Sequence, residues 1–254
     1  MNWIRDKVMS GKVISGTFLN LGSNVIAEMA GNAGFDYVLI DMEHGAGDQD
    51  ALVPILQGVS ATRAAPIVRI AWNEPPRFKR VLDMGAAGVM VPLVNSAEDA
   101  RQAVRAMRYP PAGIRGAAGS NRAANFGKGF MQYFKEANEK LLCIVQIETV
   151  DGLDQVDEIA SVDGVDVLYI GPNDLSISMG IIRQFDHPRM QEAYKNVIAA
   201  CRRHEKQAGI LISQPEQIGG IVDQGFTFIT LSSDGTNLAN IFHQQAAAFE
   251  PYRA

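Results

Sequence analysis

Charged residues stand directly after apolar runs at several places in the chain. The run Tyr37–Ile40 passes into Asp41, Glu43 and His44 with no turn residue between them, and Arg69 stands among the aliphatic residues of a second run. Charged side chains on otherwise buried strands are costly unless they are paired or hold a metal ion. Their collection at the ends of such runs therefore indicates a functional site.

Two further apolar runs end in carboxylates. Gln146 and Glu148 close the first, and Asp174 follows the second, 26 residues after Glu148. Gln146 and Glu148 are two residues apart and so face one side of a strand, and strands one βαβ unit apart lie about 5 Å from each other. Carboxylates that close repel unless a cation or a proton lies between them. Oxygen ligands without paired His or Cys favour a divalent ion such as Mg²⁺ or Mn²⁺.

Each of these residues has a structural interpretation beside the functional one. Arg69 offers the planar fork that binds a carboxylate or a developing enolate oxygen, or it is a buried ion-pair partner of Asp41 or Glu43 in a network at the mouth of a barrel. His44 beside Asp41 has the form of a general base held by a carboxylate, or it is a loop residue.

The elements that position these residues are eight apolar runs separated by helical patterns. Near-continuous apolar strands that alternate with helices indicate a parallel sheet covered on both faces. Such units fill residues 1–254, so we predict a single (β/α)8 TIM-barrel domain, with its site at the C-terminal ends of the strands. An open doubly wound sheet is less favoured, because no Gly-x-Gly-x-x-Gly follows the first strand. The expected strands are Val13–Leu19, Tyr37–Glu43, Ala65–Ala71, Gly88–Val94, Leu141–Glu148, Val165–Gly171, Ala208–Ser213 and Thr227–Ser232.

Composition excludes several other classes of protein. Apolar residues make up 47% of the 254 residues, which argues against disorder, and two cysteines are too few for a disulfide scaffold. The net charge of −5, without a basic face, argues against nucleic-acid binding. No apolar run approaches the ~20 residues of a membrane helix, and the N-terminus carries no export signal. We therefore expect a cytoplasmic protein.

Two connections are longer than usual for a barrel. They are Tyr109–Lys128 and the stretch from Asp174 to His187. Long loops in a compact domain are often lids or contact surfaces, and a tolerated surface insertion is the alternative for each.

Four motifs, in this order, resemble the HpcH/HpaI aldolase family. They are Val38–Gly45, Arg108–Gly116, Val145–Thr149 and Ile170–Ser176, and the similarity extends from about Gly16 to the eighth strand. The resemblance implies a class II, metal-dependent pyruvate aldolase on a TIM barrel. It also implies a homohexamer in which helices are exchanged between subunits.

The resemblance assigns roles to single residues. Glu148 and Asp174 would hold the metal, which is Mg²⁺, Mn²⁺ or Co²⁺, and Arg69 would contact the keto oxygen and the enolate. His44 and Asp41 would form the acid/base apparatus, and Asp83 matches an acidic residue placed near that pair.

The pyruvate side of the site is also implied by the resemblance. Gln146 matches a residue beside bound pyruvate, and the backbone N–H groups of Asn173 and Asp174 would face its carboxylate. Phe18 stands where many relatives have Trp, and Asn173 where Ala is common. The first departure would reshape the aldehyde side of the pocket, and the second would add a hydrogen-bonding group near the metal, so both bear on which aldehyde is accepted. Arg115 of the long loop is a candidate for binding a distal carboxylate.

These residues together predict the reversible cleavage of a 4-hydroxy-2-oxo acid to pyruvate and a small aldehyde through a pyruvate enolate. Three alternatives remain. An acyl-CoA lyase of the malyl or citramalyl type would need a basic CoA pocket, which is not visible in the sequence. An enolate-forming isomerase would exchange protons without releasing an aldehyde. A metal-binding scaffold would bind pyruvate without exchanging its methyl protons.

Overall fold

Eight parallel strands form the centre of the computed structural model, which describes residues 2–253. They close into a barrel in chain order, with β1 paired to both β2 and β8. The predicted (β/α)8 barrel is therefore confirmed. The strands are β1 (Ile14–Leu19), β2 (Tyr37–Asp41), β3 (Ala65–Arg69), β4 (Gly88–Val91), β5 (Leu142–Ile147), β6 (Val167–Ile170), β7 (Gln207–Ile212) and β8 (Phe228–Ser233).

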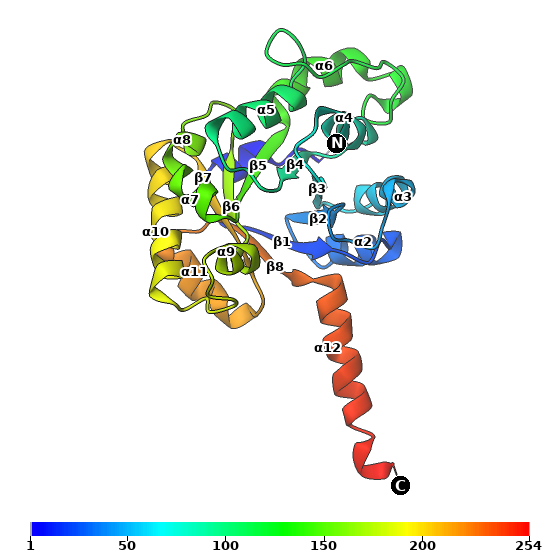
Figure 1. Cartoon of the computed structure of the whole chain (residues 1–254). Coiled ribbons are helices and arrows are strands. Elements are labelled where there is room, and N and C mark those ends of the chain that lie inside the picture. Colours follow the sequence, from blue (N-terminus) through cyan, green and yellow to red (C-terminus); the bar gives the residue numbers. More distant parts are fainter. Residues whose placement is uncertain (1, 254) are drawn as a thin grey trace.

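Helices connect the strands and surround the barrel (Figure 1). Several begin at a side chain that accepts a hydrogen bond from a free N–H of the first turn, as Ser96 does from Asp99. The α-helices are α1 (Arg5–Met9), α2 (Asn24–Asn32), α3 (Gln49–Ser60), α4 (Pro75–Met84), α5 (Ala97–Met107), α6 (Phe130–Lys140), α7 (Val150–Asp154), α8 (Val156–Ala160), α9 (Pro172–Ser178), α10 (Pro188–Arg203), α11 (Ile218–Gln224) and α12 (Asp234–Ala247). Short 3-10 turns cover Asn125–Gly127, Pro215–Gln217 and Glu250–Tyr252.

Two apolar layers follow from the alternation of side chains along each strand. One cluster fills the barrel interior and includes Phe18, Leu39, Ile67 and Ile144. The other lies between strands and helices and takes the alternate positions, such as Val38 and Ile40 on β2. Both layers are closed to solvent, and the charged residues of the strands, Asp41 and Arg69, lie where their strands end.

Most of the strands end earlier than the apolar runs that predicted them, although β1 ends at the predicted residue and β8 one residue later. The structure ends β2 at Asp41, β3 at Arg69 and β5 at Ile147. The remaining residues of each run lie in the loops above the barrel, which are still largely buried. The long connection after Asp174 also begins with a helix, α9, which has Pro172 in its first turn, where a missing N–H costs nothing.

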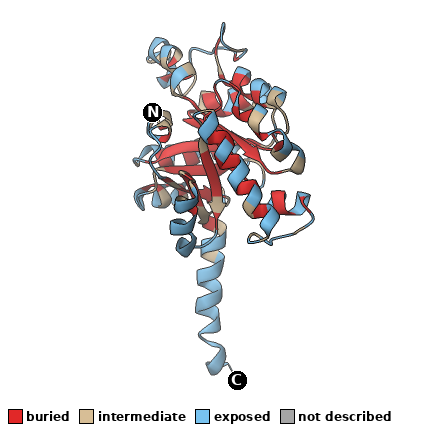
Figure 2. Cartoon of the chain, turned by 90° about the vertical axis from the view of Figure 1, so that its left-hand side faces the viewer, coloured by how far each residue is buried: buried red, intermediate tan, exposed pale blue. Residues whose placement is uncertain are grey.

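Helix α12 leaves the barrel instead of packing along it. It points away from the body of the molecule in Figure 1, and Figure 2 shows its surface exposed along its length. Only Asp234 of this helix is buried. None of the helices within residues 2–253 combines the length and apolar character needed to cross a membrane.

Candidate active site

A buried ion pair joins the C-terminal ends of β2 and β3. Asp41 and Arg69 are register partners on these strands. The guanidinium donates from Nε to Asp41 Oδ1 at 2.9 Å and from Nη2 to Oδ2 at 2.7 Å, and its Nη1 lies 3.1 Å from Glu43 Oε2. Burial alone would raise the pKa of Asp41, but the two bonds from Arg69 hold it below its ordinary value. The ion pairing considered for Arg69 is thus present, at the mouth of the barrel.

Phe18 lies against this pair from the interior of the barrel. Its ring centroid is 4.8 Å from the Arg69 guanidinium carbon, and the side chain is 5% exposed. The ring therefore supports the arginine from below, on the barrel side of the mouth, where a cation over an aromatic face is stabilised.

His44 follows the same strand but its ring does not meet Asp41. Asp41 Oδ1 accepts hydrogen bonds from the backbone N–H groups of Glu43 and His44, at 3.1 and 3.2 Å. The imidazole is 67% exposed, and its Nε2 lies 3.8 Å from Glu43 Oε2. Asp41 therefore shapes the loop that carries His44, and among residues 2–253 the nearest carboxylate to the ring is Glu43.

Glu148 lies at the end of β5 with both carboxylate oxygens in use. Oε2 accepts from Gln146 Nε2 at 2.9 Å, and Oε1 accepts from the backbone N–H of Leu93 at 2.7 Å. The residue is 4% exposed. Burial raises the pKa of Glu148 to about 7, and the nearby carboxylates of Glu43 and Asp174 add to the rise. The structure thus brings two further acidic side chains, Glu43 and Asp174, near one buried carboxylate.

The turn after β6 brings Asn173 and Asp174 to the same end of the barrel. Gly171 and Pro172 lead directly into α9, so these two residues lie in its first turn. The first N–H groups of a helix have no partner within the helix. The side chains of both residues are exposed, and the backbone and side-chain groups together offer donors and a carboxylate beside Glu148.

This donor set fits a hard divalent ion. Such an ion commonly binds through one or two carboxylates and completes its shell with water and substrate oxygens. Glu148 and Asp174 could supply the carboxylates, and Gln146 Oε1 is a buried oxygen with no hydrogen-bond partner among the described residues. Within residues 2–253 no three His, Cys, Asp or Glu side chains gather into a ligand cluster.

Asp83 and Arg115 lie at the opposite end of the barrel. Helix α4 runs from the C-terminal end of β3 back toward the start of β4, and Asp83 is near its last turn. Arg115 Nη2 donates to Asp83 Oδ1 at 2.7 Å and to Tyr133 at 3.0 Å. Arg115 is 2% exposed. In this chain Asp83 therefore does not lie near Asp41 and His44, and Arg115 anchors the 109–128 loop instead of reaching its own site.

Two supporting groups were not predicted from the sequence. Asn20, after β1, donates from Nδ2 to Asp41 Oδ2 at 2.7 Å, and a polar residue at the end of a strand was the available signal. Leu93 has φ of 53°, a conformation rare for a bulky residue. The apolar side chain of Leu93 does not indicate that its backbone N–H donates a hydrogen bond to Glu148. The sequence therefore contained no signal for this contact.

Comparison with known proteins places this arrangement in a family. Residues 14–241 match the family model described as HpcH/HpaI aldolase/citrate lyase. The chain belongs to this family. It is 44% identical over 219 residues to a 2-dehydro-3,6-dideoxy-6-sulfogluconate aldolase of Pseudomonas putida, covering 86% of each chain. It is 36% identical over 248 residues to a 4-hydroxy-2-oxo-heptane-1,7-dioate aldolase of Escherichia coli, covering 98% of this chain and 95% of the other.

A solved structure of the family agrees with the fold. The family member from Burkholderia cenocepacia J2315 superposes with a TM-score of 0.93 at 34% identity, covering 98% of this chain and 99% of that one. Aldolases at 36–44% identity over most of the chain confirm the predicted class, a carbon–carbon lyase of the pyruvate aldolase type.

Proposed function

We propose that this HpcH/HpaI family member uses a divalent ion to cleave a 4-hydroxy-2-oxo acid reversibly to pyruvate and an aldehyde. The observation that carries the proposal is the buried Glu148, with a raised pKa, beside Asp174 and close to the Arg69–Asp41 pair. A carboxylate in that position is stabilised by a cation.

Glu148 and Asp174 would hold the ion, which is Mg²⁺, Mn²⁺ or Co²⁺. When bound, it supplies Lewis-acid chemistry that makes the methyl protons of pyruvate acidic. The hydrogen bonds that Glu148 accepts from Leu93 and Gln146 support a carboxylate that is oriented before the ion arrives.

The remaining residues of the site would bind pyruvate and stabilise its charge. Arg69, held by Asp41 and Glu43, would face the keto oxygen, where negative charge develops in the enolate. The backbone N–H groups of Asn173 and Asp174 would bind the carboxylate, and Gln146 would lie beside the substrate. Phe18 would act on the substrate through Arg69, whose guanidinium its ring supports from below.

His44 would move the proton to or from the aldehyde oxygen. Its ring is exposed above the Arg69 pair and is free to approach a substrate. Asp83 would assist a His44 only from another copy of the chain, because the two lie at opposite ends of this barrel.

Assembly of such copies is the second part of the proposal. We infer a homo-oligomer, a hexamer by the resemblance, in which α12 is exchanged between subunits. Ile241 and Phe242 are exposed on α12, and Val25 and Met29 are exposed on α2 next to the barrel. Apolar surfaces of this kind on both parts support a helix that packs on a partner's barrel.

Loss and return of the metal tests the function. We expect EDTA to abolish pyruvate release from 4-hydroxy-2-oxoheptanedioate, and Mg²⁺, Mn²⁺ or Co²⁺ to restore it. The protein should also exchange the methyl protons of pyruvate in D₂O, followed by NMR. Activity that survives complete metal removal contradicts the proposed use of the ion. Exchange without aldehyde release would instead indicate an isomerase, and binding without exchange a scaffold.

A further inference from the structure

A pocket of about 290 Å³ lies beside the candidate active site, over the end of β7. Leu211 in its wall packs against the barrel-interior cluster, whereas Ile210 and Ile212, its neighbours along the strand, pack in the outer layer. The pocket therefore crosses the rim of the barrel, from the mouth toward the groove between α10 and α11. Asn173, beside the proposed metal ligand Asp174, lines it as well.

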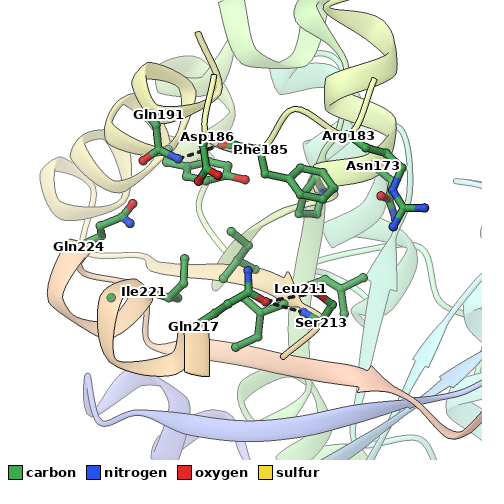
Figure 3. Close-up of a pocket in the computed structure, with 15 residues that line it drawn as sticks. Asn173, Arg183, Phe185, Asp186, Gln191, Leu211, Ser213, Gln217, Ile221 and Gln224 are labelled. Atoms are coloured by element: carbon green, nitrogen blue, oxygen red, sulfur yellow. Dashed lines mark hydrogen bonds between the residues drawn. The ribbon is translucent and has the colours of Figure 1, made fainter. Parts of the chain in front are cut away.

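Charged groups divide this pocket into two ends. In Figure 3, Arg183 and Asn173 lie at one end, and Asp186 lies nearer the end formed by Gln191 and Gln224. An anion in the pocket is thus attracted toward the active-site end and repelled from the other. The sign of the charge favours a ligand whose negative group lies near Arg183.

The backbone at Arg183 is tied to the turn that carries Asn173. Arg183 has φ of 56°, which is unfavourable for a residue with a side chain. Its N–H donates to Oγ of the fully buried Ser176 at 3.0 Å, and that hydroxyl donates to the Asn173 carbonyl at 2.7 Å. A residue that hydrogen bonds hold in the left-handed conformation points to a functional role for its position.

Arg183 is also a cation without a partner. Within residues 2–253 its side chain makes no ion pair or hydrogen bond, and only its backbone N–H is used. Arg69 is engaged by two carboxylates. Arg115 and Arg122 bond to Asp83 and to the Met84 carbonyl at the other end of the barrel. Arg183 is therefore the arginine available to a substrate at this rim.

We propose that Arg183 binds a terminal anionic group on the aldehyde half of the substrate, a carboxylate or a sulfonate. The substrate class is then a 4-hydroxy-2-oxo acid with a second acidic group at its far end. This inference rests on the proposed aldolase function and adds to it the residue that sets acceptor preference.

The test compares matched aldehydes in the addition of pyruvate by the metal-loaded enzyme. Succinic semialdehyde and butyraldehyde have four carbons each and differ in the carboxylate, and 3-sulfopropanal carries a sulfonate in place of that carboxylate at the same distance from the aldehyde. We expect Arg183→Gln to lower kcat/KM for the anionic aldehydes roughly tenfold to hundredfold, mainly through KM, because a hydrogen bond to a charged group is lost. The value for butyraldehyde should stay within about twofold, since no charge is involved.

Two controls separate specificity from structure. Arg183→Lys should recover part of the preference for anionic aldehydes, and Arg105→Gln, an exposed arginine on α5, should change nothing. Equal losses for anionic and neutral aldehydes, or no loss for either, would overturn the inference. The ratio of the two anionic aldehydes in the wild type identifies the preferred group.

Proton exchange distinguishes failure of the inference from failure of the function. Wild type and Arg183→Gln should exchange pyruvate methyl protons in D₂O at the same rate, because the proposed contact of Arg183 is with the aldehyde half and not with pyruvate. A variant that exchanges normally but keeps its preference for anions contradicts the role of Arg183 alone. A wild type without exchange contradicts the proposed aldolase function and the inference with it.

Discussion

Folding places the Glu148 carboxylate in surroundings that disfavour its negative charge. It is nearly buried, and Glu43 and Asp174 lie close enough to raise its pKa. The folded chain therefore holds the Glu148 proton more tightly than the unfolded chain does. Such a group lowers stability as the pH rises from its ordinary pKa of 4.5 to its folded value of about 7.

Replacement of Glu148 by Gln should therefore stabilise the metal-free protein above pH 7. The amide removes the buried charge, and Gln146 can turn its unpartnered Oε1 toward the new N–H₂. The expected gain is at most about 3 to 4 kcal/mol, from ~1.4 kcal/mol for each pKa unit between 4.5 and about 7. Thermal unfolding in EDTA between pH 5 and 8 measures it: the wild-type midpoint should fall with pH more than that of the variant. Glu158→Gln, at an exposed site on α8, is the control, and parallel curves for all three proteins would contradict the prediction.

Residue identities predicted part of this site. Alternation along strands placed Gln146 beside Glu148, and adjacent strand ends placed Asp41 beside Arg69. The pairing of Asp41 with the His44 ring does not occur in this chain, because Arg69 and two backbone N–H groups occupy the carboxylate. The spacing of residues in the sequence does not show which of several nearby groups will bond to the Asp41 carboxylate.

The junction of β6 and α9 determines how much space the Glu148 carboxylate has. Gly171 separates strand from helix, and a Cβ atom there would lie 2.7 Å from Glu148 Oε2 and 3.4 Å from Gln146 Nε2. Its φ of −90° suits any residue. The glycine is therefore required by the space around Glu148 and not by its own backbone.

We expect Gly171→Ala to weaken Mn²⁺ binding roughly tenfold or more, as loss of support around a metal ligand does. The methyl group must displace the Glu148 carboxylate, while the unfolding midpoint should change little. Isothermal titration with Mn²⁺ gives the affinity. Gly219→Ala on α11, where a Cβ meets nothing within 4 Å, should bind Mn²⁺ as the wild type does. An unchanged Mn²⁺ affinity in Gly171→Ala would contradict this prediction, because Glu148 would then have moved aside without any loss of metal binding.

Elements were easier to predict than their ends. Apolar runs predicted the β strands, because only a strand buried on both faces needs such a composition. The start of α9 was predicted as loop, since Gly171-Pro172 resembles a turn and a seven-residue helix leaves little periodicity. The position of Asp83 away from the site follows from the direction of α4 in the barrel. The identity of the residue alone does not predict it.

Helix α12 bears on how the whole molecule assembles with other copies. Its exposed Phe242 is 61% accessible, so a charge at this position should be harmless in a single chain. In an assembly with exchanged helices the same charge would be buried against a partner's barrel and would be costly.

Phe242→Asp should therefore yield smaller species without unfolding the barrel. Analytical ultracentrifugation measures the assembly, and circular dichroism checks the fold. Gln244→Asp adds the same charge to α12, at a polar position about 200° around the helix from Phe242, and should leave the assembly intact. An unchanged sedimentation coefficient for Phe242→Asp would exclude the exchange of α12 through this residue.

The left-handed backbone of Arg183 links substrate choice to the energy of folding. Glycine would adopt φ of 56° with less strain than arginine does. A chain under selection for heat resistance alone would gain from that exchange, and a chain under selection for acidic substrates would not. Thermostability and discrimination between substrates are thus opposing demands on one loop position.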